Sequence, residues 1–337
     1  MEIIRFLAIC LVVFNHTDGY FIHFATTDNS LTYCISMAVS VICRINVPLF
    51  FMVSGALLLR KEEDLSTLYK KRIVRIAAVI IIFSAIQYTA NQIAGKLTGE
   101  WSVISFLKSL YTADVTESYW FLYSYMAILL MLPFLRKMAR GMTEQEFRYL
   151  FLLKIIFDVV LRVIATYSGI SVGLSLWILT DNVFYVMFGY YMEHILTKRR
   201  YEMFHMGKIT ALFLVFVLLS MGAVVAEYLV KGEYSQSYLG IFTPVLAIMV
   251  YYMVKSICMK YTLPEIGYKT AVYLGGSAFG IYLIEKLVRR QLLPLYLYLC
   301  QVTVGPLANT VYVLGTIGLA LIYVSIMKKV PGIRQLI

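Results

Sequence analysis

The sequence has few charged residues, few histidines and no paired cysteine motif, and each shortage excludes a class of protein. Only 15% of the 337 residues are Asp, Glu, Lys or Arg, whereas 61% are hydrophobic. A soluble domain of this length could not bury so much apolar side chain. The four histidines and five cysteines are scattered, without a C-x-x-C pair or metal-ligand spacing, so we expect no metal site and no redox centre.

The sequence is rich in long apolar runs. Stretches of about 20 apolar residues, the length that crosses a bilayer as a helix, recur ten times. The sequence therefore predicts an all-α, polytopic bundle of about ten transmembrane helices, in one integral-membrane domain over 1–337 without a soluble appended domain. The first span lacks a signal-peptide cleavage site, so we expect it to be retained; residues 101–111 predict a short interfacial helix. The predicted spans are 3–24, 33–59, 72–95, 119–138, 148–167, 174–195, 209–230, 238–260, 271–293 and 303–327.

The net charge of +11 is distributed as in a membrane protein rather than a nucleic-acid-binding one. If both termini are cytoplasmic, the predicted inner loops carry 20 Lys and Arg residues and the outer loops only three. This asymmetry follows the positive-inside rule and predicts an N-in, C-in protein of the cell membrane. The excess cations are then explained by topology and by anionic lipid, with no nucleic-acid partner.

Arg5 and His16 are expected on one face of the first span. Their separation of eleven residues is three helical turns plus roughly 20°, which puts them about 16 Å apart along the axis. An imidazole deep in a membrane suggests a functional site, with Asn15 beside it. A bundle histidine that simply hydrogen-bonds a neighbouring helix is an equal alternative.

Glu285, in the ninth predicted span, is the best carboxylate partner for His16. Both residues are expected roughly 20 Å above the cytoplasmic side, because each lies 13 or 14 residues from the inner end of its span. The alternative is an ion pair within the same helix, between Glu285 and Arg289 at i+4.

Two further groups of polar residues lie within the spans. Pro48 predicts a kink or break in the second span, where freed carbonyls with Arg44 and Ser54 would form a polar seam. Lys154, Asp158 and Arg162 follow at four-residue steps and favour an interhelical salt-bridge ladder over a catalytic group.

Cations and aromatic residues at the span ends have two interpretations each. Arg72 and Arg75 suit phosphate groups, or they satisfy the positive-inside rule alone. Trp120 and Tyr123 suit a sugar ring, or they belong to the aromatic belt. Arg289 and Arg290 suit an anionic glycan or lipid-linked phosphate, or they anchor their helix.

These residues together resemble the acyltransferase-3 family of membrane O-acyltransferases. Arg5, ten intervening residues and His16 are similar to the family's R-x10-H signature, and the run from Lys70 to Arg75 resembles its cytoplasmic R-x-x-R motif. Segments 47–59, 119–123 and 279–284 also resemble family segments, in family order. One departure is that many members carry histidine where this chain has Glu285.

The resemblance implies transfer of an acyl group, usually acetyl, from cytoplasmic acyl-CoA to a hydroxyl of a cell-envelope polysaccharide or lipid-linked sugar. His16 would act as general base or as transient acyl carrier, Arg5, Arg72 and Arg75 would bind the phosphates of the acetyl-CoA co-substrate, and Asn15 or Arg44 would stabilise the oxyanion. Trp120 and Tyr123 would contact the acceptor.

The rival class is a secondary transporter or exporter of a glycan or anionic metabolite, since broken helices and midplane charges occur there too. CoA binding separates the two classes. The sequence identifies neither the acceptor nor the oligomeric state, and a homo-oligomer stays open.

Overall fold

The structure, a computed structural model, describes residues 1–17, 30–95, 102–170, 173–174, 180–196, 205–232, 234, 236 and 238–337. All regular elements in these ranges are helical, in agreement with the predicted all-α class. The outer end of the first predicted span and part of the sixth, together with Trp101 at the start of the predicted interfacial helix, lie outside the described residues. The helices are α1 (Glu2–Asn15), α3 (Ser30–Cys43), α4 (Asn46–Leu58), α5 (Leu65–Leu68), η1 (Tyr69–Ile73), α6 (Val74–Ile93), α7 (Val103–Tyr111), η2 (Glu117–Tyr119), α8 (Trp120–Gly141), α9 (Glu144–Ile155), η3 (Ile156–Val160), α10 (Leu161–Ser168), α11 (Asp181–Tyr190), η5 (Tyr191–Ile195), α13 (Met206–Lys231), α14 (Thr243–Lys260), α15 (Glu265–Gly275), α16 (Ala278–Val302), α17 (Gly305–Met327) and α18 (Ile333–Leu336).

Several helices are long and apolar enough to cross a membrane, which makes this a multi-pass membrane protein. The described residues contain six such helices, and the bent pair α15–α16, with 56° between its parts, would be a seventh. Of the other predicted spans, α1 and α11 are helices of only 14 and 10 residues, and the rod 144–168 carries Lys154, Asp158 and Arg162 at its centre. The count of ten spans and the orientation therefore stay predictions.

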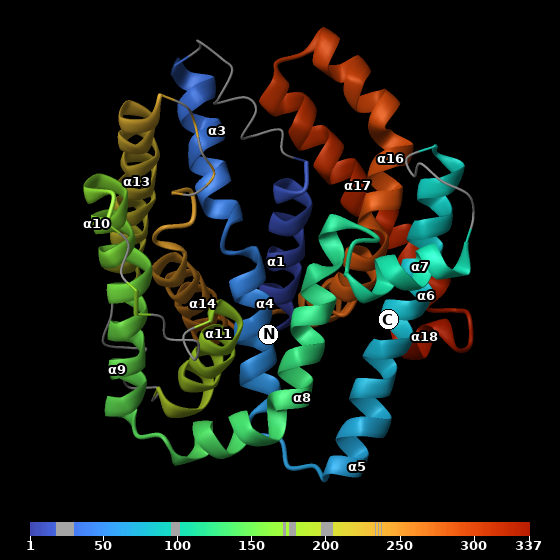
Figure 1. Cartoon of the computed structure of the whole chain (residues 1–337), viewed down its shortest axis with the longest axis horizontal. Helices are drawn as coiled ribbons and strands as arrows, with labels where there is room; N and C mark the ends of the chain where they lie inside the picture. Colours follow the sequence, from blue (N-terminus) through green and yellow to red (C-terminus); the bar gives the residue numbers. More distant parts are fainter. Residues whose placement is uncertain are drawn as a thin grey trace.

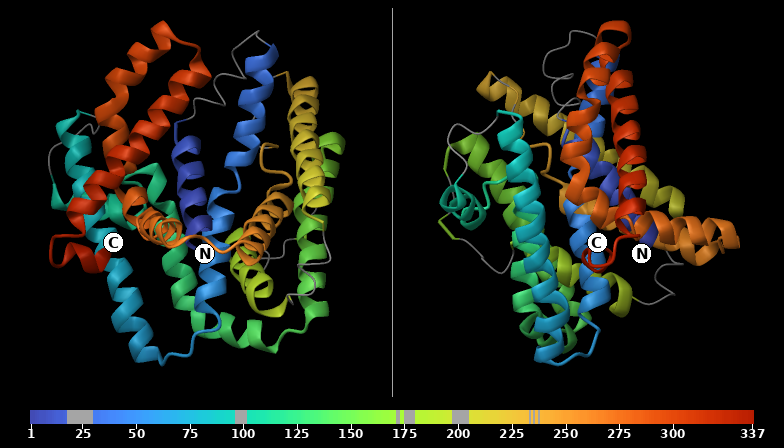
Figure 2. Two further views of the ribbon diagram at one scale, coloured as in Figure 1. Left: turned by 180° about the vertical axis from the view of Figure 1, so that it is seen from behind. Right: turned by 90° about the vertical axis from the view of Figure 1, so that its right-hand side faces the viewer.

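Helix α1 lies in the middle of the bundle (Figure 1) and packs against α3, α4, α15, α16 and α17. One side of α1 is fully apolar and buried, with Ile4, Ala8 and Ile9 at 2% exposure or less, as the 3.6-residue period requires of a helix enclosed by others. Helices α16 and α17 form an antiparallel hairpin at one edge, orange to red in both views of Figure 2. The end of α1 that carries His16 therefore faces α16 directly.

The second predicted span, Leu31–Leu58 in the structure, is interrupted in the turn before Pro48. Helix α3 ends at Cys43 and α4 begins at Asn46, so the break is at Arg44 and Ile45. Pro48 stands in the first turn of α4, where a proline is tolerated because the first backbone N–H groups have no intrahelical partner. Because Pro48 has no N–H to bond the Arg44 carbonyl four residues earlier, the break lies in the turn that this proline disturbs, and the predicted break is confirmed.

Helices α4 and α11 cross in backbone contact. A Cβ atom on Gly55 would lie 1.8 Å from the carbonyl oxygen of Val186, and one on Gly189 would lie 1.9 Å from that of Met52. Only glycine fits at such distances, as is usual where membrane helices approach closely. This crossing fixes the start of α11 against the polar break before α4.

Candidate active site

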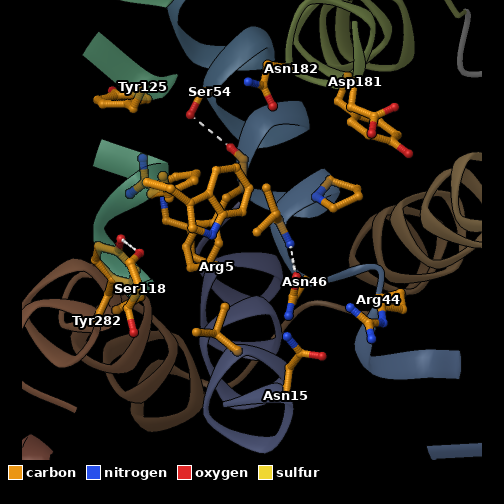
Figure 3. Close-up of a pocket in the computed structure, with 18 of the residues that line it drawn as sticks. Arg5, Asn15, Arg44, Asn46, Ser54, Ser118, Tyr125, Asp181, Asn182 and Tyr282 are labelled. Carbon is orange, nitrogen blue, oxygen red and sulfur yellow. Dashed lines mark hydrogen bonds between the residues drawn. The ribbon is translucent and has the colours of Figure 1, made fainter. Parts of the chain in front are cut away.

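A cavity of about 680 Å³ lies along α1 and α4 and extends to α8, α11 and α16. Figure 3 shows Arg5 near its centre, Ser118 and Tyr282 on one side, and Arg44, Asp181 and Asn182 on the other. The cavity is polar for a space between membrane helices, and such groups are costly there unless they serve a function. Its charged or titratable lining residues are Arg5, His16, Arg44, Arg75, Tyr125, Asp158, Arg162, Asp181, Tyr185 and Tyr282.

His16 and Glu285 meet as their predicted depths require. His16 follows directly after α1, and its Nδ1 is 2.9 Å from Oε1 of Glu285 on α16. The Glu285 side chain is completely buried, whereas that of His16 is 19% exposed and lines the cavity. The predicted pair between the first and ninth spans is thus present.

Arg289 contacts both members of this pair. Glu285 therefore has both of its predicted partners, His16 and Arg289, at the same time. The Nε of Arg289 donates to Oε2 of Glu285 at 2.6 Å, and its Nη1 donates to the backbone carbonyl of His16 at 2.6 Å. Ser118 Oγ donates to the same Glu285 oxygen as His16, at 3.4 Å. A buried carboxylate needs such compensation, and here the compensation also holds the end of α1 against α16.

The proton positions on His16 follow from these contacts. A carboxylate ion-paired with arginine only accepts hydrogen bonds, so Nδ1 carries a hydrogen, and Nε2 is the nitrogen that holds the basic lone pair in the neutral imidazole. Among the described residues no hydrogen bond reaches Nε2. The geometry therefore presents an imidazole that is oriented through Nδ1 and lines the cavity.

Arg5, Asn15 and Arg44 line the same cavity as His16. Arg5 is 34% exposed and paired with Glu2 at 2.8 Å, one helical turn away. Arg44 stands in the break before α4 and donates to the side-chain oxygen of Gln236. The third member of the predicted seam, Ser54, donates to the carbonyl of Phe50 in its own helix at 2.8 Å.

Arg72 and Arg75 face a second cavity of about 470 Å³, which also touches Lys71. Arg75, Ile76 and Tyr125 line both cavities, so the two spaces adjoin. Arg75 donates to the carbonyl of Leu336 at 3.1 and 3.2 Å, a neutral acceptor that leaves its charge uncompensated.

Glu63, in the loop before α5, holds Arg72 in place. Its Oε1 accepts from Arg72 and from Arg136 at 2.8 Å each. Burial alone would raise the pKa of this carboxyl, but the hydrogen bonds and charges of the two arginines outweigh it and hold the pKa below its usual value. Glu63 therefore stays ionised and Arg72 stays oriented.

Trp120 and Tyr123, the two aromatic residues predicted to contact the acceptor, lie in different surroundings. Trp120 is 47% exposed and lines the first cavity. Tyr123 lines neither cavity and donates its hydroxyl to the carbonyl of Leu110 at 2.6 Å, which holds α7 against α8. Arg289 and Arg290 also line neither cavity. Arg290 donates to Asn91, and both predicted roles of this pair, anion binding and helix anchoring, stay predictions.

Sequence reasoning assigned no site role to several residues that the structure brings to the first cavity. Ser118 and Tyr282 lie beside Glu285, with the Tyr282 hydroxyl donating to the Ser118 carbonyl. Asp158 and Arg162 were interpreted as part of a ladder. Lys154 does bridge helices, to Asp158 at 2.7 Å and to Asp181 on α11, but Arg162 faces the cavity.

Among the residues that the structure describes, no group of three or more His, Cys, Asp or Glu side chains is arranged to hold a metal ion. The arrangement can do acid–base chemistry with an oriented imidazole, and it has cations for an anionic co-substrate.

Comparison with known proteins identifies one family. A family model described as an acyltransferase domain, that of the acyltransferase-3 family, matches residues 1–327. No curated protein and no solved structure matches the chain.

Proposed function

The chain belongs to the acyltransferase-3 family, and from this premise we propose that it transfers an acyl group, acetyl by preference, from cytoplasmic acyl-CoA to a hydroxyl of a cell-envelope polysaccharide or lipid-linked sugar. The observation that carries the proposal is the His16–Glu285–Arg289 cluster at the wall of a cavity that adjoins the second cavity. Four cations, Arg75 among them, and three carboxylates line that second cavity. This arrangement pairs a general base with a phosphate-binding region, which acyl transfer from CoA requires.

The donor enters through the second cavity in this proposal. Arg72, Arg75 and Lys71 bind the CoA phosphates through charge-assisted hydrogen bonds, and Arg75 exchanges its present carbonyl partner for a phosphate. The pantetheine arm then passes Arg75 and Tyr125, which line both cavities, and carries the thioester toward Arg5 and His16.

The reaction is completed at His16. Its Nε2 takes the proton of the acceptor hydroxyl while the hydroxyl oxygen attacks the thioester carbonyl. The carbon–sulfur bond breaks, the CoA thiolate leaves, and the imidazolium returns the proton to the thiolate. Glu285 stabilises the imidazolium, and Asn15 and Arg44 are the candidate donors to the oxyanion.

A second route uses the same geometry. Nε2 attacks the thioester carbonyl, the carbon–sulfur bond breaks, and the CoA thiolate leaves with the acyl group bound to His16. In the second step the acceptor hydroxyl attacks this acyl group, the acyl–nitrogen bond breaks, and the hydroxyl proton passes to the freed Nε2. The first route gives sequential kinetics and the second gives ping-pong kinetics.

Arg75→Gln is expected to raise the KM for acetyl-CoA by about tenfold, because one charge-assisted contact to phosphate is lost, with a smaller change in kcat. Steady-state kinetics on protein in lipid nanodiscs measure this. The matched control is Lys70→Gln, an exposed cation of the same segment that lines neither cavity; it should leave KM unchanged. An equal rise in both variants would point to the positive-inside charge alone.

A further inference from the structure

The end of the first cavity near α10 and α11 is built from polar groups that the proposed chemistry does not use. Asp158 and Arg162 reach it from the rod 144–168, and Asp181 and Asn182 from the start of α11. Figure 3 shows Asp181 and Asn182 across the cavity from Ser118 and Tyr282. These four residues are named the far wall below.

A buried lysine holds the carboxylates of the far wall in position. The Lys154 side chain is 2% exposed and does not line the cavity, and its Nζ contacts Oδ2 of Asp158 at 2.7 Å and Oδ1 of Asp181. Burial of an ammonium group costs several kcal/mol unless it is paired. The lysine therefore fixes both carboxylates from behind, while their side chains remain 28% and 67% exposed.

The outward groups of the far wall make no hydrogen bonds among the described residues, although the charges of Asp158 and Arg162 attract each other. No hydrogen bond within the described part of the chain uses Oδ1 of Asp158, Oδ2 of Asp181, the Arg162 guanidinium or the Asn182 side chain. The far wall thus presents to the cavity two carboxylate groups that accept hydrogen bonds, beside a guanidinium and an amide that donate them.

This combination matches adjacent hydroxyl groups, because each hydroxyl both donates and accepts a hydrogen bond. The charges of Lys154, Asp158, Arg162 and Asp181 cancel, and the carboxylates of the far wall repel a phosphate or uronate. Arg44, the cation on the same side of the cavity, is held by a hydrogen bond to Gln236. The half-exposed Trp120 adds an aromatic face to the same cavity.

We propose that the far wall is the acceptor subsite and that it takes an uncharged sugar ring through a pair of neighbouring hydroxyls. This inference rests on the proposed acyl transfer and adds the location and charge class of the acceptor. It assigns Asp181 and Asn182 to binding the sugar, with Lys154 as a positioning residue behind them.

The test is acetyl transfer from acetyl-CoA to matched methyl glycosides by the purified protein. The acceptors are methyl hexopyranosides of the glucose, galactose and mannose series and the corresponding methyl uronides, with CoA release and acetylated sugar measured separately. We expect kcat/KM for at least one neutral glycoside to exceed that of its uronide by about tenfold, from the electrostatic repulsion.

Two variants link this preference to the far wall. Asp181→Asn should raise the KM for the neutral glycoside by about tenfold, with the KM for acetyl-CoA unchanged, and should weaken the discrimination against the uronide. Asn182→Ala, which leaves the Lys154 contacts intact, should raise the KM for both sugars. The control is Asp114→Asn, an exposed aspartate that lines neither cavity.

The outcomes separate this inference from the proposed function. Equal use of neutral and uronide acceptors, an unchanged acceptor KM in both variants, or consumption of acetyl-CoA without any acetylated glycoside would overturn the far-wall assignment alone. A wild-type protein that neither binds nor consumes acetyl-CoA would overturn the proposed function and this inference together.

Discussion

Replacement of His16 by alanine is expected to lower the rate of acyl transfer by about two to four orders of magnitude, the usual contribution of a general base. If His16 carries the acyl group, the loss is complete. The reason is that, of the described residues at the cavity, His16 alone carries an imidazole, which the buried Glu285 orients through Nδ1. Acetylated product formed per unit of folded protein measures the effect.

The matched control for this variant is His205→Ala. His205 is exposed, precedes α13 and lines neither cavity, so its loss should leave turnover unchanged. Size-exclusion profiles and thermal unfolding show whether each variant is folded. Normal turnover by a well-folded His16→Ala protein would refute the assignment of the active site.

Glu285→Gln is expected to lower kcat by about a hundredfold or more with little change in the KM for acetyl-CoA, because the amide keeps the shape but loses the charge that stabilises the imidazolium. The variant also leaves Arg289 without its ion-pair partner. Steady-state kinetics separate kcat from KM, and a purely structural defect would lower the amount of folded protein instead.

The coupling between Glu285 and Arg289 provides the second part of this test. Since Arg289 contacts both Glu285 and the His16 carbonyl, Arg289→Gln should reduce kcat too, and the double variant should lose less than the product of the single losses. Glu265→Gln, which removes an exposed carboxylate on α15 that is paired only with Lys269, is the control. Independent, multiplicative losses would mean that the two residues do not act as a unit.

The sequence was sufficient to predict the helical class and the central pair of the site. Counting residues from the span ends puts His16 and Glu285 at one depth, because a helix rises by a constant 1.5 Å per residue, and their contact at 2.9 Å follows. The same counting could not choose between His16 and Arg289 as the partner of Glu285. The structure satisfies both, since each carboxylate oxygen takes one of them.

The far wall could not be predicted from the sequence, because the contacts that form it depend on how two helices pack. Lys154 and Asp181 are 27 positions apart in the chain, and only the crossing of α11 over α4 brings the start of α11 beside the rod 144–168. Helical periodicity places Asp158 and Arg162 on one stripe of that rod, but it does not say that the stripe faces a cavity. The fixed place of Arg72 depends in the same way on Glu63, a loop residue without a periodic signal.

The most direct test of the central claim is incubation of purified wild-type and His16→Ala protein with acetyl-CoA that carries a radiolabelled acetyl group, without acceptor. We expect both proteins to bind the nucleotide, and any label retained on the protein, as an acyl-histidine, to be found in the wild type alone. In a second incubation, with a sugar acceptor added, only the wild type should transfer the label to the sugar. Retained label would select the two-step route, and transfer without retained label would select the direct route. Absence of acetyl-CoA binding in the wild type would contradict the account and favour a transporter.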